Sequence, residues 1–377
     1  MESIEQMIKR LCPKGVEWKK ISEIAYYPKV RINTEILSVD TYVGVESLIT
    51  DRGGKTSSSS LPEGVAIEFL PQDILIGNIR PYLKKIWLSD CQGGTNGDVI
   101  CIRVLDSKEV IPKYLYHNLA SDKFFDYDNS HAKGGKMPRG DKNAILAYKI
   151  PVPPLEIQSR IVEVLDKMAT LTAELKAELE ARKQQYEYYR SKLLTFNEIG
   201  GGNRQVAWKK ISEICVKVYS GRNKSKTEQG LYPVYGSTGI IGMCESPVYN
   251  KRQILVARVG ANAGFVHLAD GSYDVSDNTI IIDLSKEVNQ KFVFYMLRNA
   301  NLNKFAKGGG LPLLTATQIK DFVIPVPSME EQQRIVSILD RFETLTTDLQ
   351  SGLPAEIEAR RQQYEYYRNK LLTFDAV

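Results

Sequence analysis

The chain has 377 residues, 43% of them hydrophobic, and a formal net charge of +5 at pH 7. This length and apolar content predict two or three packed domains, and no apolar run reaches the roughly 18 residues of a membrane span. The five cysteines lie far apart without a Cys-x-x-Cys motif, which disfavours a disulfide framework or a zinc site. Because the acidic N-terminus also lacks the apolar stretch of a signal peptide, we expect a cytoplasmic protein with reduced thiols.

The first globular segment is expected at residues 16–153, after a short N-terminal arm at 1–15. Short β-rich runs bounded by Gly, Pro, Asn and Asp are typical of strands, and they lie at Val65–Phe69, Asp73–Gly77 and Asp98–Val104. A helical stretch follows at Pro112–Asp122, and then a glycine-rich loop at Lys133–Arg139. This order predicts a mixed α and β domain.

A long helix is expected at residues 154–197. It begins after Ile150–Pro153, and its apolar residues recur in steps of three and four from Ile161 to Leu193, which is one stripe at heptad-like spacing. Forty residues of helix extend over roughly 60 Å. Because so narrow a stripe on so long a helix cannot be buried by one small domain, the sequence predicts a second long helix as its partner.

The second half of the chain repeats the first. Trp18–Ile24 returns letter for letter at Trp208–Ile214, and Ala181–Phe196 returns almost unchanged at Ala359–Phe374. We therefore expect a linker and second globular segment at 198–327 and a second long helix at 328–377. The corresponding β-rich runs, helical stretch and glycine-rich loop lie at Gln253–Val259, Thr279–Asp283, Gln290–Asn299 and Lys307–Leu313.

These elements predict an α+β fold class: two mixed α/β domains joined by two long antiparallel helices that form a coiled coil, with a pseudo-two-fold internal repeat. The second long helix is longer than the first by about four residues, close to one helical turn. The extra length falls at Ser351–Pro354, where Gly352 and Pro354 interrupt the helical pattern. We expect a break or kink near 351–354, with Pro354 opening a second helical piece.

Catalytic motifs are missing from the sequence. No G-x-S-x-G or H-E-x-x-H occurs, the Asn/Asp-Pro-Pro-aromatic tetrad of amino-methyltransferases is absent, and Gly53–Thr56 lacks the first glycine of a P-loop. The three histidines, His117, His131 and His267, are isolated and are expected to have structural roles. The basic excess falls outside the long helices, which favours an anionic partner for the globular segments, although a solvated basic surface is the alternative.

The motifs resemble one known family. Each copy combines Ile-Pro-Val-Pro, a Glu-x-Gln-x-Arg-Ile-Val helix start (Glu156–Val162, Glu330–Val336) and a Tyr-Glu-Tyr-Tyr-Arg-x-Lys-Leu-Leu helix end. This arrangement is similar to the specificity subunit of type I restriction-modification systems. Two further stretches, Ile74–Lys85 and Tyr232–Gly239 with Ile254–Gly260, resemble target-recognition domains of that family.

The resemblance implies a non-catalytic subunit that binds double-stranded DNA. Segments 16–153 and 198–327 would be target-recognition domains, each reading half of a split, asymmetric site, and the helices would be spacers that dock two methyltransferase (modification) subunits and restriction (motor-nuclease) subunits. Half-sites on one DNA face lie about 34–36 Å apart. The chain itself would bind no cofactor or metal, because S-adenosylmethionine, ATP and Mg²⁺ would be used by the partners. The alternative is a two-domain coiled-coil scaffold or adaptor that binds proteins.

Candidate DNA-binding residues are of the types that contact base edges and phosphates. In the first half they are Arg52, Lys55, Ser57, Asn78, Arg80, Tyr82, Lys84, Lys136 and Arg139. In the second half they are Arg222, Lys224, Lys226, Tyr235, Ser237, Thr238, Arg258 and Asn262. In the sequence register Arg258 aligns with Asn78.

Two features have more than one interpretation. The glycine-rich loops either pass close to phosphates or are simple turns. Tyr188 and Tyr366, which lie off the apolar stripe beside an arginine, either anchor a partner subunit or pack at the rim of the other helix.

Overall fold

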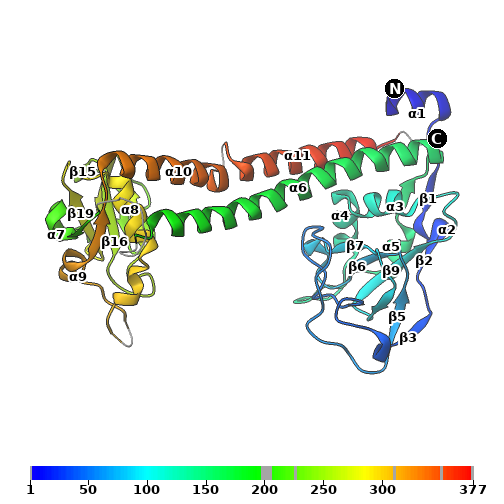
Figure 1. The fold of residues 1–377 in the computed structure, drawn as a ribbon. Helices are drawn as coiled ribbons and strands as arrows, with labels where there is room; N and C mark the ends of the chain where they lie inside the picture. The colour runs from blue at the N-terminus through cyan, green and yellow to red at the C-terminus, as the bar shows by residue number, and fades with distance from the viewer. Residues whose placement is uncertain (1, 197–205, 225–226, 309–310, 349–350, 375–377) are drawn as a thin grey trace. The chain divides into compact units, whose positions relative to one another are not determined.

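The computed structural model describes residues 2–196, 206–224, 227–308, 311–348 and 351–374. The chain forms two compact units, Met1–Leu175 with Ile357–Val377, and Lys176–Glu356. The long helices contribute to both units, so each unit is an α/β domain that carries its own portion of helix (Figure 1).

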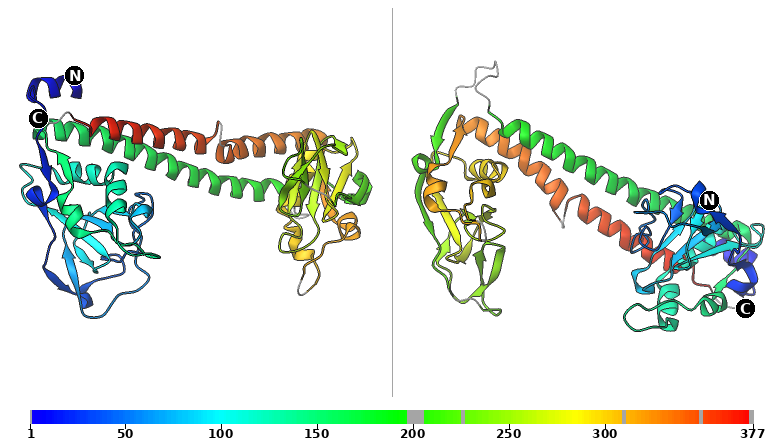
Figure 2. Two further views of the ribbon diagram at one scale, coloured as in Figure 1. Left: turned by 180° about the vertical axis from the view of Figure 1, so that it is seen from behind. Right: turned by 90° about the horizontal axis from the view of Figure 1, so that it is seen from below.

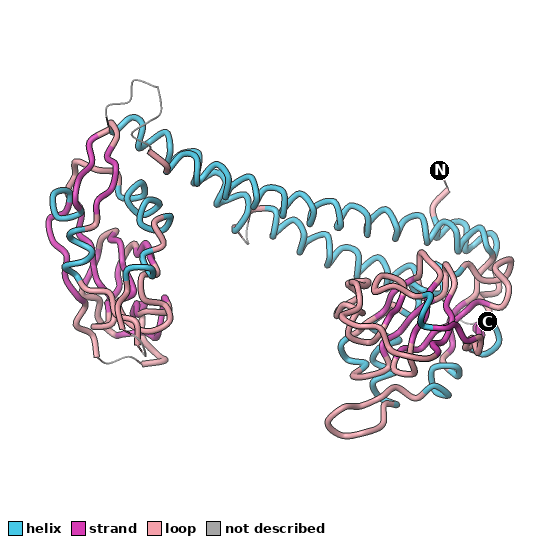
Figure 3. Tube along the Cα trace, turned by 60° about the horizontal axis from the view of Figure 1, so that its bottom comes forward, coloured by secondary structure: helices cyan, strands magenta, loops and turns pink. Residues whose placement is uncertain are grey.

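The first unit contains two four-stranded sheets and a two-stranded ribbon, with the strand orders β2-β9-β6-β7, β3-β5-β8-β4 and β1-β10. Figure 3 shows loops extending from the ends of these strands. The strands are β1 (Trp18–Lys20), β2 (Ala25–Tyr26), β3 (Arg31–Asn33), β4 (Tyr42–Val43), β5 (Val65–Phe69), β6 (Ile74–Gly77), β7 (Ile86–Leu88), β8 (Gly93–Thr95), β9 (Val99–Val104) and β10 (Lys149–Pro151).

Short helices precede and connect the strands of the first unit. They are α1 (Ile4–Leu11), α2 (Ile21–Ile24), η1 (Thr34–Ile36), η2 (Pro81–Leu83), α3 (Pro112–Leu119), α4 (Asp122–His131) and α5 (Lys142–Ala147). The helix expected at 112–122 ends at Leu119, because the Ser121 side chain accepts a hydrogen bond from the Phe124 amide and caps a separate helix, α4.

The second unit repeats this plan. Its sheets have the orders β12-β19-β16-β17 and β14-β13-β18-β15, and its ribbon pairs β11 with β20. The strands are β11 (Ala207–Lys210), β12 (Cys215–Ser220), β13 (Tyr232–Gly236), β14 (Gly239–Cys244), β15 (Tyr249–Asn250), β16 (Gln253–Ala257), β17 (Val266–Ala269), β18 (Ser272–Val275), β19 (Thr279–Leu284) and β20 (Val323–Val326). The short helices are α7 (Ile211–Ile214), α8 (Gln290–Asn299), η3 (Leu302–Phe305) and α9 (Ala316–Asp321).

Strand register shows how closely the two units correspond. In the first unit Phe69 pairs with Gly93, and β4 and β8 are parallel. In the second unit Tyr249 pairs with Tyr273, and β13 and β18 are parallel. The extra edge strand differs, because β3 extends the first unit's sheet beyond β5 whereas β14 extends the second unit's sheet beyond β13. The internal duplication therefore extends to residue pairing within the sheets.

A buried glutamine fastens the start of each long helix to its domain. The Gln158 side chain accepts a hydrogen bond from the Ile111 amide (2.9 Å) and donates one to the Pro153 carbonyl (2.7 Å). Gln332 repeats both contacts, with the Asn289 amide (2.9 Å) and the Pro327 carbonyl (2.8 Å). The glutamine of the Glu-x-Gln-x-Arg-Ile-Val motif thus satisfies main-chain groups that burial would otherwise leave unpaired.

An ion pair repeats alongside each glutamine. Lys113 of α3 lies 2.6 Å from Asp166, and Lys291 of α8 lies 2.6 Å from Asp340. The first aspartate also accepts from His117, which is buried and hydrogen-bonds Tyr364, and burial lowers the pKa of this histidine below its usual value. His117 therefore has the structural role expected from the sequence.

The long helices pair antiparallel within each unit. In the first unit the start of α6 (Leu155–Leu194) shares a core with the end of α11 (Leu353–Leu371). In the second unit the end of α6 packs with α10 (Met329–Thr347), where the rings of Tyr189 and Phe342 are stacked at 5.7 Å. Both views in Figure 2 show α11 beside the start of α6 and α10 beside its end. Two α/β domains joined by paired long helices are the fold expected from the sequence.

The second long helix is interrupted between its two halves. Helix α10 ends at Thr347, and α11 begins at Leu353 with Pro354 in its first turn, where proline needs no amide partner. At Gly352 a Cβ would lie 2.5 Å from the Thr344 carbonyl oxygen, so the close approach of the chain to the end of α10 requires glycine. Among the described residues no helix is long and apolar enough to cross a membrane.

Candidate nucleic-acid interface

Three loop segments meet at the end of β6 in the first unit and form what we term the first platform: Asn78–Arg80, the turn at Asp98 and the hairpin Lys133–Gly140. The Asn78 amide donates to the Asp98 carbonyl (2.9 Å), and the Arg80 amide donates to the Pro138 carbonyl (2.7 Å). The Gly140 amide closes the arrangement by donating to the Asn78 carbonyl (3.0 Å).

The second unit contains the same arrangement, the second platform, formed by Arg258–Gly260, the turn at Asn278 and the hairpin Lys307–Leu314. The Arg258 amide donates to the Asn278 carbonyl (3.0 Å), and the Gly260 amide donates to the Pro312 carbonyl (3.0 Å). The Leu314 amide donates to the Arg258 carbonyl (2.8 Å). The alignment of Arg258 with Asn78 is therefore confirmed by equivalent main-chain hydrogen bonds.

Both glycine-rich loops are hairpin turns that pack on these platforms. Paired main-chain hydrogen bonds join Lys133 with Arg139 and Lys307 with Leu313. Gly134 has a φ of 105° and Gly308 a φ of 119°, a region that L side chains rarely adopt. Turn geometry thus explains Gly134 and Gly308, whereas Gly309 and Gly310 lie outside the described residues.

The side chains on the two platforms differ although the main chains match. Arg258 replaces Asn78, Asn278 replaces Asp98, and Leu313 replaces Arg139. On the first platform Arg139 forms an ion pair with Asp98 at 2.9 Å. On the second, the side-chain contacts of Arg258 within the described part of the chain are long, 3.4 Å to Ser220 and 3.4 Å to the Asp277 carbonyl. The two platforms therefore offer different hydrogen-bonding groups on one framework.

Several buried polar atoms have no hydrogen-bond partner among the described residues: Asn78 Oδ1, Arg80 Nε and Arg258 Nε on the platforms, and both carboxylate oxygens of Asp128 on the neighbouring helix α4. Burial of Asp128, which is 1% exposed, raises its pKa to about 6. Asn78 and Asp128 converge on Gly140, where a Cβ would lie 3.0 Å and 2.5 Å from their Oδ1 atoms. Unpaired polar atoms are uncommon in proteins and call for a structural or functional explanation.

Four candidates from the first half are engaged in contacts within the domain. Arg52 and Lys84 both form ion pairs with Asp122. Lys55 donates to the Asp40 carbonyl (2.8 Å) and lies over the Trp87 ring, and Ser57 donates to the Asp40 carboxylate. Asn78, Arg80, Lys136 and Arg139 lie on the first platform, where Lys136 is exposed, and Tyr82 is exposed beside it.

The second-half candidates fall into three groups. Tyr235 and Ser237 with Thr238 lie on the β13–β14 hairpin, and the Ser276 amide, near the second platform, donates to the Tyr235 carbonyl (2.8 Å). Exposed Arg222 and Lys224 follow β12, and the Arg222 amide donates to the Val275 carbonyl (3.1 Å). Arg258 is on the platform itself and Asn262 follows it, whereas Lys226 lies outside the described residues.

A polar cleft of about 550 Å³ adjoins the second platform. Asn262 lines it, but most of its polar lining was missed by the sequence analysis: Arg190, Arg298, Asn299, Asn301, Asn303 and Lys304. The signal available was the composition of Asn299–Lys304, which holds three asparagines and a lysine in six positions. No group of His, Cys, Asp and Glu suited to a metal ion occurs among the residues that the structure describes.

The tyrosine pairs on the long helices are equivalent in the two copies. Tyr188 is 60% exposed and Tyr366 is 61% exposed. Each packs edge-on against the next tyrosine, Tyr189 or Tyr367, at 5.3 Å. Large exposed aromatic side chains repeated on one scaffold are typical of protein contact sites.

Comparison with known proteins gives consistent results. Residues 75–181 and 203–359 match the family described as type I restriction modification DNA specificity domain. The chain is 36% identical over 304 residues to the EcoR124I/EcoR124II specificity subunit of Escherichia coli, covering 71% of this chain and 72% of that protein. It is 30% identical over 297 residues to a putative type I restriction enzyme specificity subunit of Haemophilus influenzae, covering 72% and 75%.

Solved structures share the fold. The S subunit of a type I restriction-modification system from M. genitalium superposes with a TM-score of 0.61 at 15% identity, covering 96% of this chain and 97% of that one. The HsdS subunit from Thermoanaerobacter tengcongensis gives 0.54 at 18% identity, with coverage of 96% and 97%. The paired arrangement of α/β domains and long helices is therefore shared by proteins of very different sequence.

Proposed function

The chain belongs to the family of type I restriction-modification specificity subunits, and from this premise we propose that its two domains read the two halves of a bipartite, asymmetric DNA site. It is the DNA specificity subunit of a type I restriction-modification complex and the non-catalytic component of that enzyme. The domains that read DNA are assigned to residues 16–153 and 198–327, with spacer helices at 154–197 and 328–377.

The observation that carries this proposal is the pair of platforms. Each places a loop from a central strand, a turn and a glycine hairpin together through three main-chain hydrogen bonds. Base edges are distinguished by side-chain donors and acceptors, and these differ between the platforms at Asn78/Arg258, Asp98/Asn278 and Arg139/Leu313. A symmetric protein reads a palindrome, whereas two different surfaces on one scaffold suit two different half-sites.

Within each domain the exposed or half-buried candidates on or near a platform are assigned to DNA, including Arg139 despite its pair with Asp98, and the candidates paired away from the platforms are assigned to local structure. Arg52 and Lys84 share Asp122 and hold the domain together. The residues that we assign to DNA contact are Arg80, Tyr82, Lys136, Arg139, Arg222, Lys224, Tyr235, Ser237, Thr238, Arg258, Asn262 and Asn278.

Modification subunits are assigned to the long helices, one at each tyrosine pair. Tyr188 and Tyr366 have nearly equal exposure and equivalent aromatic neighbours, so two copies of one partner can use the same contact. Restriction subunits join this complex. S-adenosylmethionine, ATP and Mg²⁺ are assigned to the partner subunits.

Methylation mapping in cells that express the chain with its modification subunits tests the reading function. We expect methylation at a motif of two unlike halves separated by a fixed gap. Arg139→Ala should relax the sequence requirement in one half only, and Arg258→Ala in the other, because a lost bidentate base contact costs about 1–3 kcal/mol of discrimination. Lys149→Ala, an exposed lysine on β10 outside the platforms, should leave both halves unchanged.

Gel shifts at stated salt concentrations can contradict the proposal, because they compare binding to the mapped duplex with binding to a scrambled duplex. If the assembled complex binds the mapped duplex no better than a scrambled one, the domains do not read DNA, and a protein-binding scaffold becomes the better interpretation. If Arg139→Ala and Arg258→Ala alter the same half-site, the assignment of one half to each domain is wrong.

A further inference from the structure

The two copies of the long helix have the same arginine near their ends, but its surroundings differ between the two units. Arg368 and Arg190 occupy the same place in the repeated Tyr-Glu-Tyr-Tyr-Arg segment. Arg368 is fully buried, and its guanidinium lies 3.2 Å from the carboxylate of Asp122. Arg52 and Lys84 also pair with this carboxylate. One acidic side chain in the first unit thus draws together three cations.

The second unit keeps the arginine, but among its described residues no counterpart of Asp122 lies in the cleft beside it. Arg190 lines the polar cleft beside the second platform, and the adjoining stretch Asn299–Lys304 contains no acidic residue. The position of Lys84 is taken by Gly264, and both residues have positive φ values, 50° and 92°. The space that Asp122 and its ion-pair partners fill in the first unit is an open cleft in the second unit.

Positive charge is concentrated in this cleft. Arg190, Arg298 and Lys304 line it together with asparagine side chains, and no acidic residue is among its described lining residues. Arg190 and Arg298 each pair with one glutamate on a long helix, Glu187 and Glu343. For Lys304, which is exposed, the described residues provide no salt-bridge partner, and Arg190 Nε is shielded from solvent without a hydrogen-bond acceptor among them.

The end of helix α8 affects the choice of occupant. Carbonyl groups at a helix C-terminus favour cations, and in the first unit the Ala120 carbonyl at the end of α3 accepts from Arg52. In the second unit Arg298 lies in the last turn of α8 and supplies a positive charge from the helix itself. With Arg190 and Lys304 beside it, the balance favours an anion.

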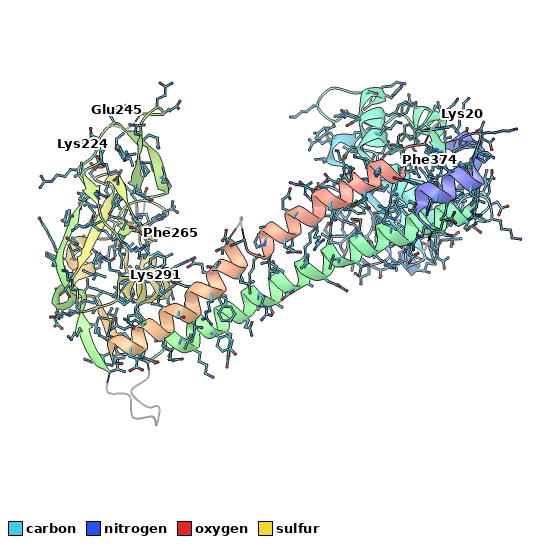
Figure 4. All side chains as sticks on the ribbon, turned by 90° about the horizontal axis from the view of Figure 1, so that it is seen from above. Lys20, Lys224, Glu245, Phe265, Lys291 and Phe374 are labelled. Carbon is cyan, nitrogen blue, oxygen red and sulfur yellow. The ribbon has the colours of Figure 1, made fainter. Side chains whose placement is uncertain are left out.

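We propose that this cleft binds a backbone phosphate of DNA next to the half-site read by the second domain, an inference that rests on the proposed function. The loop after β16 links the two sites directly: Arg258–Gly260 form the platform, and Asn262 and Phe265 of the same loop line the cleft (Figure 4, where Phe265 is labelled). Lysine, arginine and asparagine side chains are the usual phosphate contacts and set the position of a protein on the duplex. In the first unit Asp122 occupies the equivalent place as an internal anion.

The salt dependence of DNA binding tests this assignment. The full chain, assembled with its modification subunits, is titrated with the duplex identified by methylation mapping between 50 and 200 mM salt. Each phosphate contact contributes about −0.9 to the slope of log K against log salt concentration. Lys304→Gln should make the slope shallower by about one unit, so that the affinity ratio of wild type to variant shrinks about 3.5-fold across this range. Lys304→Arg should restore the wild-type slope.

Matched controls separate this effect from a general change in charge. Lys286→Gln removes an exposed lysine of the same unit that does not line the cleft, and it should leave the slope unchanged. Arg298→Gln provides a second variant and should make the slope of log K against log salt concentration shallower, as Lys304→Gln does. Because Lys304 is exposed, its replacement should not alter unfolding.

Three results would overturn the assignment. The first is a wild-type slope in both Lys304→Gln and Arg298→Gln. The second is an equal change in Lys286→Gln. The third is weaker assembly of Lys304→Gln with modification subunits in the absence of DNA and an unchanged slope, which would assign the cleft to a carboxylate of the partner. Wild-type binding to the mapped duplex is measured in the same series, so loss of the proposed function itself is recognised separately.

Discussion

The buried carboxylate of Asp128, which has no hydrogen-bond partner in the described part of the chain, should weaken the first domain at neutral pH. Burial of this side chain raises its pKa from 3.8 to about 6, so ionisation costs more in the folded than in the unfolded chain. The stability that protonation provides is fully present below pH 3.8 and is lost as the pH rises through about 6. A shift of roughly two pKa units corresponds to about 3 kcal/mol. Asp128→Asn removes the charge and should stabilise the domain by up to about this amount at pH 8.

Denaturant unfolding monitored by tryptophan fluorescence measures the effect. In a Trp208→Phe background the remaining tryptophans, Trp18 and Trp87, both lie in the first unit. The gain from Asp128→Asn should be about 1.4 kcal/mol smaller at pH 5 than at pH 8, because the wild-type carboxyl is largely protonated at the lower pH. Asp126→Asn, an exposed neighbour on α4, should show no such difference. An equal effect of Asp128→Asn at both pH values would refute the reasoning.

Three further predictions concern the scaffold. Gln332→Ala removes the acceptor of the half-buried Asn289 amide and should lower the free energy of unfolding of the second unit by about 1–3 kcal/mol. The exposed neighbour Gln333→Ala should change it little in the same urea titration. Asp73→Asn weakens the pair between the buried Asp73 carboxylate and the half-buried Arg103 guanidinium and should cost about 1–3 kcal/mol in the first unit. Exposed Asp90→Asn is the control, and a loss under about 1 kcal/mol would contradict the importance of that pair. Deleting Ser351–Pro354 removes about one helical turn and should change the gap tolerated between half-sites, measured with duplexes of graded spacing, and unchanged spacing would exclude this helix as the ruler.

Elements with strong local patterns could be predicted from the sequence. The β-rich run Val65–Phe69 and the helical stretch Gln290–Asn299 have the predicted bounds, because alternation and helical periodicity are properties of neighbouring residues. The break between α10 and α11 was expected because Gly352 and Pro354 are themselves the signal. Strands of two or three residues, such as β2 and β4, are too short for a period and are fixed by their partners.

The pairing of the candidate site residues could not be predicted from the sequence, because the residues in contact are far apart along the chain. Arg52 looks like any basic loop residue, yet it pairs with Asp122. The cleft brings Arg190 of α6 together with Asn262 and Lys304, residues that share no local motif. Composition identifies residues able to contact DNA, but only tertiary structure determines which of them have already been paired within the domain.

Main-chain hydrogen bonds explain how the two platforms can diverge without loss of the fold. The bonds at Asn78 and at Arg258 join amides to carbonyls, so they persist whichever side chain is present. The contacts that do require particular side chains, those of Gln158 and Gln332, lie at the starts of the long helices. A substitution on a platform therefore alters the donors and acceptors offered to a ligand, whereas a substitution at the helix starts alters stability. This separation accounts for the divergence of the surfaces assigned to DNA while the main-chain framework beneath them is kept.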